Sequence, residues 1–435
     1  MLGGCAHYAP APLATPEAAL AAPDLALLSA EAARIERPFL ASQAIDLSKP
    51  LTLNEIAVIT VLANPDLKAQ RAKAGVTDAQ AFAARLLPDP TAQLSFDKLI
   101  SGPDMLNGFG GQLGFDLAQL RTARITRESG AASRSQVRLD LAWAEWQYAS
   151  NAQVQAVRIV ALRRQLELAR ATLASAETWL GRVQRAAGRG DVAGSDTDAR
   201  RLALIDASDK VRTGEHDLAA ARLELNKLMG IPPDTVIAIA EPAAPVIPPD
   251  AATLTAQAIG RRLDLAALRA GYGVGEADVH KAILEQFPNI SLTVASARDT
   301  AGNLTIGPQL GFSLPLWNRN RGAIAITNAT RAQLRAEYDA RLFQTRADIA
   351  AAVSGLAVIR QQRAELVAQL PAIERYAAAT ARAAKRGDLS LSTAESAAQS
   401  LRDRRSALAA LYQQAAEQTI LLEQLSGGPS EGWSK

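Results

Sequence analysis

Residues 185–192 read RAAGRGDV and residues 382–389 read RAAKRGDL, the same pattern 197 positions apart. The same offset relates residues 112–115 (QLGF) to residues 309–312 (QLGF). Nearer the amino terminus the offset is 198, where Pro90 corresponds to Pro288. Self-similarity over this length indicates that one structural unit occurs twice in the chain.

We expect five segments on this basis. Residues 1–50 form an amino-terminal extension and residues 51–230 form repeat 1. A proline-rich linker covers 231–251, residues 252–427 form repeat 2, and residues 428–435 form a tail.

Each repeat has the same predicted order of parts. An opening helix covers residues 53–87 or 252–286 and ends before Pro90 or Pro288, since proline interrupts the helical hydrogen-bond ladder. A β-hairpin follows at 91–117 or 288–314, and Pro315 marks the junction after the second hairpin. A long helical hairpin completes the repeat, with helices at 121–187 and 195–229 in the first copy and at 320–385 and 390–426 in the second. Its turns lie near residues 190 and 387, and Pro371 is expected to kink the second long helix.

The strands have one apolar face. In the last strand Leu304, Ile306, Leu310 and Phe312 alternate with small or polar residues, which is the period of a strand buried on one side. Four strands are too few to close a barrel, whereas three chains would supply twelve. The fold class predicted from these patterns is therefore mainly α with a small β part, in which several chains pool their strands into one closed barrel. The alternative is a pair of soluble hairpins that cap a helical bundle.

Composition narrows the function. Charge is nearly balanced at +3, which disfavours a nucleic-acid binder. The sequence holds no run of about 18 apolar residues, so we expect no transmembrane helix. The three histidines are scattered, and one cysteine with three methionines offers no soft-metal cluster. We expect no enzyme activity, no cofactor and no metal site.

The amino terminus contains Leu2-Gly3-Gly4-Cys5, which resembles the end of a bacterial lipoprotein signal. The basic and apolar regions that precede such a site are missing here. We expect Cys5 to carry lipid, and the alternative is an incidental cysteine near the end of the chain.

These features together resemble the TolC-like outer-membrane efflux proteins, over about residues 50–427. The motifs are Leu51-Thr52-Leu53 with Asn64-Pro65-Asp66-Leu67, and residues 314–322 (LPLWNRNRG) after the last strand. The latter is most similar to the CzcC-like branch that serves heavy-metal pumps. The resemblance implies a homotrimer in the lipid of the outer membrane. Its fold would be a trimeric α-helical barrel in the periplasm joined to a 12-stranded transmembrane β-barrel with four strands per protomer. Its partners would be a periplasmic adaptor protein and an inner-membrane RND pump, and its task passive export of heavy-metal cations.

The two turns are the predicted docking tips for the adaptor. Their residues are Arg189, Gly190, Asp191 and Val192 in the first copy, and Arg386, Gly387, Asp388 and Leu389 in the second. The glycines permit a positive φ, and the apolar residues would seat helices of a partner. The alternative is that each turn is a simple helix cap.

Threefold symmetry would turn one acidic residue per chain into a ring of three, so we expect a periplasmic gate at Asp196, Asp198 and Glu395. The position equivalent to Asp196 is Thr393, which weakens the acidic pattern in the second copy. Trp143, Trp146 and Phe343 are assigned to packing between helices.

Two other functions stay open from the sequence. The same duct would also suit multidrug efflux or type I secretion of polypeptides. A protein of another class, a soluble coiled-coil scaffold, would explain the helices but not the duplicated strand hairpins.

Overall fold

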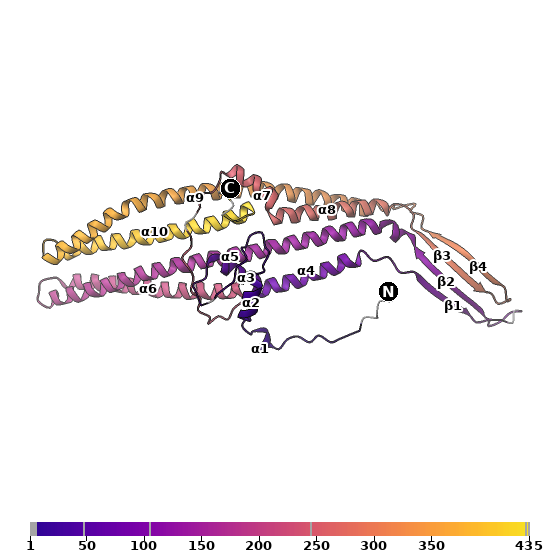
Figure 1. Cartoon of the computed structure of the whole chain (residues 1–435), viewed down its shortest axis with the longest axis horizontal. Helices are drawn as coiled ribbons and strands as arrows, with labels where there is room; N and C mark the ends of the chain where they lie inside the picture. Colours follow the sequence, from indigo (N-terminus) through magenta and orange to yellow (C-terminus); the bar gives the residue numbers. More distant parts are fainter. Residues whose placement is uncertain (1–6, 47, 104–105, 244–245, 431–432, 434–435) are drawn as a thin grey trace. The chain divides into compact units, whose positions relative to one another are not determined.

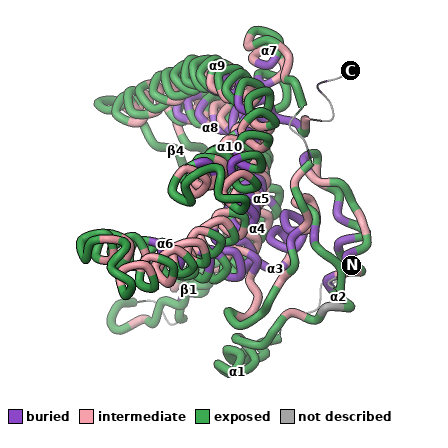
Figure 2. Tube along the Cα trace, turned by 90° about the vertical axis from the view of Figure 1, so that its left-hand side faces the viewer, coloured by how far each residue is buried: buried purple, intermediate pink, exposed green. Residues whose placement is uncertain are grey.

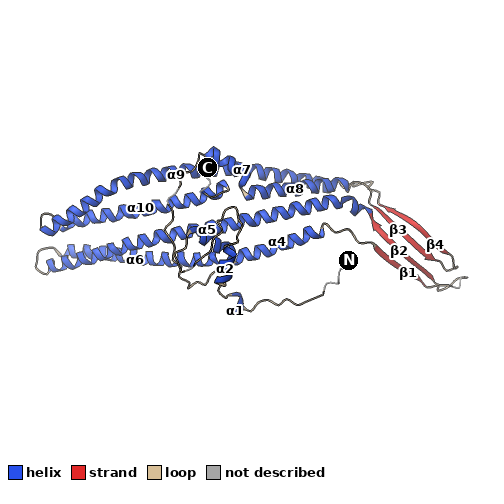
Figure 3. Ribbon diagram, viewed as in Figure 1, coloured by secondary structure: helices blue, strands red, loops and turns tan. Residues whose placement is uncertain are grey.

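The computed structural model describes residues 7–46, 48–103, 106–243, 246–430 and 433. Cys5, the predicted lipidation site, lies outside these residues. The chain is mainly helical with one four-stranded antiparallel sheet, as the sequence predicts (Figure 3). Two short helices, α1 (Pro16–Ala19) and α2 (Leu25–Ala32), precede the repeats.

Both repeats contain the same elements in the same order. Repeat 1 holds α3 (Leu53–Ala63), α4 (Pro65–Ala83), β1 (Thr91–Asp97), β2 (Gly108–Asp116), α5 (Leu117–Ala187) and α6 (Gly194–Met229). Repeat 2 holds α7 (Ala251–Arg261), α8 (Leu263–Leu284), β3 (Ile290–Arg298), β4 (Leu304–Phe312), α9 (Arg321–Arg386) and α10 (Leu391–Ser426).

The compact units of the structure combine segments of both repeats. The sheet unit comprises residues 69–144 and 255–348, and so contains all four strands. The tip unit comprises residues up to 68, 145–254 and 349 onward, and contains both turns of the long helical hairpins (Figure 1).

The opening helix of each repeat is broken, so the prediction of one helix over 53–87 and over 252–286 is wrong. In repeat 1 the break falls at Asn64, since a residue before proline is disfavoured in the helical region. Asn64 is only 2% exposed. Its Oδ1 accepts from the Leu67 amide (3.0 Å), and its Nδ2 donates to the Leu228 carbonyl (2.9 Å).

In repeat 2 the break falls at Arg262, which is 4% exposed and lies inside the sheet unit. Its guanidinium donates to both carboxylate oxygens of Asp264, at 2.9 and 2.7 Å, and lies over the ring of Trp143 at 5.0 Å. The break is therefore held by a buried ion pair instead of a neutral cap.

The sheet joins the two repeats. Its order is β1-β2-β3-β4, and the central pairing of β2 with β3 runs from Phe109 opposite Arg298 to Asp116 opposite Ser291. β1 and β4 are the outer strands, each paired on one side only. The second repeat is thus needed to complete the sheet that the first begins.

The long helix α9 continues through Pro371. Among the described residues it is the one helix with a window long and apolar enough to span a membrane, with 22% of that window buried. The expectation that no such helix exists fails by this criterion, because alanine-rich windows with few charges count as apolar without a continuous apolar run. A helix of an alanine-rich bundle meets the same criterion, so the finding is weak evidence for a membrane span.

The core of the tip unit gathers around α3, whose residues 56–61 are all buried (Figure 2). The amino-terminal segment packs on α5 nearby. Phe39 stacks on Trp146 with ring centroids 4.9 Å apart, and Arg37 pairs at 2.5 Å with Glu145, whose side chain is 1% exposed. Trp146 is a packing residue as predicted. Phe343 in the sheet unit is 75% exposed, so its predicted burial between helices does not occur within one chain.

Candidate functional site

The first tip ends α5 with a left-handed glycine. Gly190 has φ +79°, and the Asp191 amide donates to the Ala186 carbonyl at 3.0 Å. This six-to-one bond across a left-handed residue is the Schellman arrangement of a helix end. Arg189 closes the turn with an ion pair to Asp191, Nε to Oδ2 at 2.8 Å.

The second tip repeats this geometry bond for bond. Gly387 has φ +85°, and the Asp388 amide donates to the Ala383 carbonyl at 2.9 Å. Arg386 pairs with Asp388, again Nε to Oδ2 at 2.8 Å. A Cβ added to either glycine would meet no atom within 4 Å. The glycines are therefore required by their φ angle alone, and the surface around both tips is open.

Each tip presents one apolar side chain after its aspartate. Leu389 is 42% exposed and Val192 is half-buried. The helices that follow start differently, because Ser390 caps α10 by accepting from the Thr393 amide at 3.2 Å. The equivalent Ala193 of α6 provides no side-chain cap. The two tips share the turn but not the first turn of the return helix.

The predicted gate residues differ in whether their carboxylates form ion pairs. Glu395 is half-buried and paired with Arg402 at 2.5 Å, two turns further along α10. Asp198 pairs with Arg201 at 3.2 Å. Within the described part of the chain, the carboxylate of Asp196 in the first turn of α6 has no ion-pair partner. Of the three, Asp196 is the one whose charge stays available for a ring.

The sheet has two chemically distinct faces. The residues Leu94 and Phe96 of β1 lie on the same face as their partners in the neighbouring strands, and this face is apolar and exposed. Its other large members are Phe109, Leu113, Phe115, Ile290, Val294, Leu304, Ile306, Leu310 and Phe312. A continuous exposed apolar face of this kind marks a surface made for lipid or for a partner.

The opposite face of the sheet is small and polar. It holds Thr, Ser, Gln, Ala and Gly residues and two carboxylates, Asp97 near one end and Asp116 at the other. The alternation places Arg298, the one basic residue of the four described strands, on the apolar face at the strand end. The sequence predicts the apolar face, whereas the acid-only polar face is seen only once the register is known.

The predicted junction residues lie beside the strands. Pro90 directly precedes β1, Pro288 precedes β3 by two residues, and Pro315 follows β4 by three. They bound the strands as predicted from the sequence pattern.

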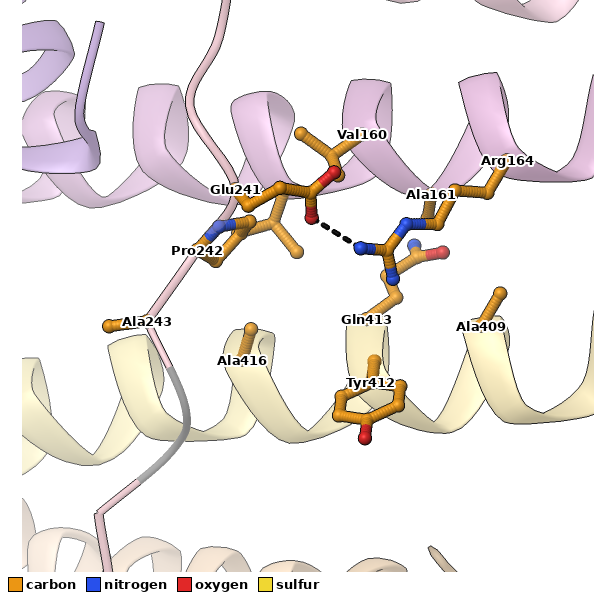
Figure 4. A pocket seen from close by; sticks show the side chains of 11 residues that line it. Val160, Ala161, Arg164, Glu241, Pro242, Ala243, Ala409, Tyr412, Gln413 and Ala416 are labelled. Carbon is orange, nitrogen blue, oxygen red and sulfur yellow. Dashed lines mark hydrogen bonds and ion pairs between the residues drawn. The ribbon is translucent and has the colours of Figure 1, made fainter. Parts of the chain in front are cut away.

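The tip unit contains a cavity of about 360 Å³ between α5, the linker after α6, and α10 (Figure 4). It is crossed by an ion pair between Arg164 and Glu241. The other lining residues shown are mainly small or apolar, with Tyr412 and Gln413 on α10. Its two charged groups neutralise each other, so the cavity offers no constellation for acid–base or nucleophilic chemistry. No group of three or more His, Cys, Asp and Glu side chains among the described residues is placed to hold a metal ion.

Comparison with known proteins identifies this architecture. Residues 254–428, nearly the whole of repeat 2, match the family model described as outer membrane efflux protein. This segment is similar to that family, and the match covers 175 of the 435 residues. Members of this family are channels and not enzymes. No curated protein sequence matches the chain.

Solved structures of outer-membrane channels share the fold of this chain over most of its length. The CusC structures, described for folding and transmembrane channel formation, have a TM-score of 0.69 at 17% identity and cover 94% of this chain and 99% of theirs. The outer-membrane channel OprN has a TM-score of 0.71 at 17% identity, with 94% and 96% covered. VceC, an outer membrane protein of Vibrio cholerae, has a TM-score of 0.71 at 16% identity, with 87% and 96% covered. These likenesses establish the fold of the chain.

Proposed function

We propose that this protein is the outer-membrane channel of a tripartite export system and works as a homotrimer. The observation that carries the proposal is the four-stranded sheet, which has an apolar exposed face and two unpaired edges. Unpaired backbone groups in lipid cost several kcal/mol each, so such a sheet needs neighbours on both sides. Three copies supply twelve strands, and TolC-family channels form trimers within tripartite systems.

The two tips are proposed as the docking surface for a periplasmic adaptor, which would connect the duct to an inner-membrane RND pump. Supporting this are the identical turn geometry, the open surroundings of Gly190 and Gly387, and the apolar side chain next to each turn. A turn that serves only as a helix cap has no need for the same ion pair in both copies.

Heavy-metal cations are the proposed cargo. Residues 314–322 support it by their sequence pattern, and the polar sheet face supports it by charge, since it carries Asp97 and Asp116 without a basic residue. A pore lined by acids alone favours cations over anions. Cys5 is proposed as the site of a lipid anchor in the outer membrane.

Light scattering of the protein extracted in detergent tests the assembly. A mass of three chains supports the proposal, and a well-behaved monomer refutes it. Membrane fractionation addresses the scaffold alternative, which predicts that the protein stays in the soluble fraction.

Growth of a deletion strain tests the cargo. Plates graded in zinc, cobalt, cadmium, nickel and copper are compared with plates that contain hydrophobic drugs. Sensitivity to metals alone, restored by the intact gene, supports metal export. Sensitivity to drugs alone would assign the duct to multidrug efflux, and loss of a secreted polypeptide would assign it to type I secretion.

A further inference from the structure

Pro308 lies in the middle of β4, the outer strand of repeat 2. Its partner across the ladder is Val294 of β3. The equivalent position in repeat 1 is Gly111, in the inner strand β2. Proline has no amide N–H, so the direction in which this group would point decides what the substitution does.

The ladder of β3 and β4 fixes that direction. The Ser313 amide donates to the Asn289 carbonyl (3.2 Å) at one end, and the Asp299 amide donates to the Asn303 carbonyl (3.0 Å) at the other. Hydrogen-bonded and non-hydrogen-bonded pairs alternate along an antiparallel ladder. Counting in from either end makes Val294 and Pro308 a non-hydrogen-bonded pair, so the missing N–H of Pro308 faces away from β3, toward the free edge of the sheet.

The same count explains why repeat 1 has glycine there. Arg298 forms a non-hydrogen-bonded pair with Leu304 of β4, so it directs its backbone groups to Phe109 of β2. Two residues along, Ser296 is hydrogen-bonded to Gly111. A proline at position 111 would remove a bond inside the sheet, whereas a proline at position 308 removes a bond only at the edge.

The free edge of β4 directs the backbone groups of five residues outward, namely Leu304, Ile306, Pro308, Leu310 and Phe312, with the proline in the centre. Two copies of the chain can bring these edges together in two ways. One pairs β4 with the free β1 edge of the next copy, which continues the antiparallel order and can be repeated until a ring closes. The other pairs β4 with β4 of a second copy, which buries the same edge twice and cannot lead to a trimer.

Pro308 penalises the two pairings unequally. Pairing with β1 loses one hydrogen bond, because Ala92, Leu94 and Phe96 on that edge all keep their N–H groups. Pairing of β4 with β4 over its full length sets Pro308 opposite Pro308, and both bonds of the central pair are lost. Any shorter register that contains both prolines also loses two.

We propose that Pro308 acts as an edge guard, which disfavours β4–β4 pairing between two copies and so directs the β4 edge to β1 of the next copy. Natural sheets use proline at exposed edges to block unwanted pairing. The inference rests on the proposed trimer but assigns a role in assembly to a residue that lies outside the tips and the pore face.

The test uses the full chain with Pro308→Ala, expressed in the outer membrane and extracted in detergent. One hydrogen bond is worth roughly a factor of five in a pairing constant. Restoring two bonds to the β4–β4 encounter and one to the β4–β1 encounter therefore shifts the first pairing of two copies about fivefold toward the wrong partner. Light scattering should show a correspondingly larger share of dimer. The matched control is Gly307→Ala, since an added Cβ there meets open space and its N–H faces β3.

Cross-linking reports the register of the dimer. Ile306→Cys combined with Leu310→Cys places two cysteines opposite each other only when β4 pairs with β4, and the chain with Cys5 alone gives the background. About fivefold more cross-linked dimer is expected when Pro308→Ala is added than when the native proline is kept, and Leu310→Cys alone should give none. Equal trimer fractions for the native chain and the Pro308→Ala variant, or equal cross-linking in both, would contradict the proposed role of Pro308. A native protein that is not a trimer would instead overturn the proposed function.

Discussion

The two repeats make the same bend in their opening helices with different chemistry. Repeat 1 uses Asn64, a neutral cap followed by proline, and repeat 2 uses Arg262 paired with Asp264 in a buried site. A cap costs little to bury because its groups are neutral and satisfied. A buried ion pair costs more to form and much more to break, since removal of one partner leaves an uncompensated charge. Duplication thus preserves the position of the bend while its stabilising chemistry has changed.

A second pair of positions has kept its chemistry. Asp78 of α4 accepts from Arg134 (2.7 Å) and Arg138 (2.9 Å) of α5, and the equivalent Glu276 of α8 accepts from Arg331 of α9 (3.2 Å). Both acids tie an opening helix to a long helix within the sheet unit. At Asp78 and Glu276 the two repeats keep the same kind of interaction. At Asn64 and Arg262 they keep only the position of the helix break.

The largest expected difference between the repeats lies in the sheet. Gly111→Pro should abolish the folded sheet and the trimer, because it removes a bond between β2 and β3. The natural proline at the equivalent position 308 is tolerated at an edge. Gly111→Ala is the control, since its Cβ would meet only Leu94 at an ordinary 3.5 Å. A trimer of normal heat stability on gels for Gly111→Pro would contradict the register described above.

Substitutions at the two helix bends should give the next largest loss of stability. Arg262→Ala leaves the buried Asp264 with the Leu265 amide at 2.9 Å and with Arg341, at 3.9 Å, as its remaining ion-pair partner among the described residues, and should destabilise the protein by about 3 kcal/mol. Asn64→Ala removes a cap and one bond to the Leu228 carbonyl, for a loss of about 1–2 kcal/mol. Thermal loss of the helical circular dichroism signal measures both. An equal or larger effect of Asn64→Ala would remove the contrast drawn between the two bends.

Substitutions of the two tip glycines should lower the stability less than those at the helix bends, and by the same amount in both repeats. Gly190→Ala and Gly387→Ala each force a positive φ on a residue with a Cβ, at a cost of about 1 kcal/mol, with no added clash. Asparagine at the same positions should recover part of that loss, because it tolerates the left-handed region. The readout is the unfolding midpoint of each variant. A clear difference between the two tips would show that their shared geometry hides unequal surroundings.

The smallest effect concerns pH. Hydrogen bonds from Arg138 and Arg134 lower the pKa of Asp78 below its ordinary 3.8, and hydrogen bonds from Tyr272 and Arg331 lower the pKa of Glu276 below 4.5. A lowered pKa contributes stability above the ordinary value, and this is lost as the pH falls through the folded-state pKa. Asp78→Asn and Glu276→Gln should therefore destabilise slightly at pH 7 and lose that effect in acid. Unfolding midpoints measured from pH 7 downward through the ordinary values of 3.8 and 4.5 should show this deficit shrink, and a deficit that stays constant over the whole range would assign it to packing.

Much of the fold follows from the sequence because its signals are local. The offset of 197 aligns the tips, and strand alternation with bounding prolines places all four strands. The break at Asn64 has a local signal, the proline that follows it directly, but the prediction of one helix over 53–87 did not use this signal. The break at Arg262 could not be predicted, because no local signal distinguishes a surface arginine from one buried against Asp264 and Trp143.

The positions of the candidate tip residues could be predicted from the sequence, whereas the ion pairs of the acidic residues beside them could not. The tip residues follow from the duplicated motif alone. The ion pair of Glu395 with Arg402 joins residues two helical turns apart and depends on the rotamers of both, so it could not be predicted from the sequence. Phe343 shows the same limit, since its exposure depends on which helices surround it.

The pairing of β2 with β3 also means that the sheet cannot be completed until repeat 2 has been synthesised. More than 170 residues separate Asp116 from Ile290, so β2 has no partner on that side until repeat 2 has been made. At roughly 5–20 residues per second, synthesis leaves this strand uncovered for on the order of ten to forty seconds. The newly made chain therefore exposes an unpaired β2 edge until repeat 2 is complete, and this edge is where we expect a holding chaperone to bind.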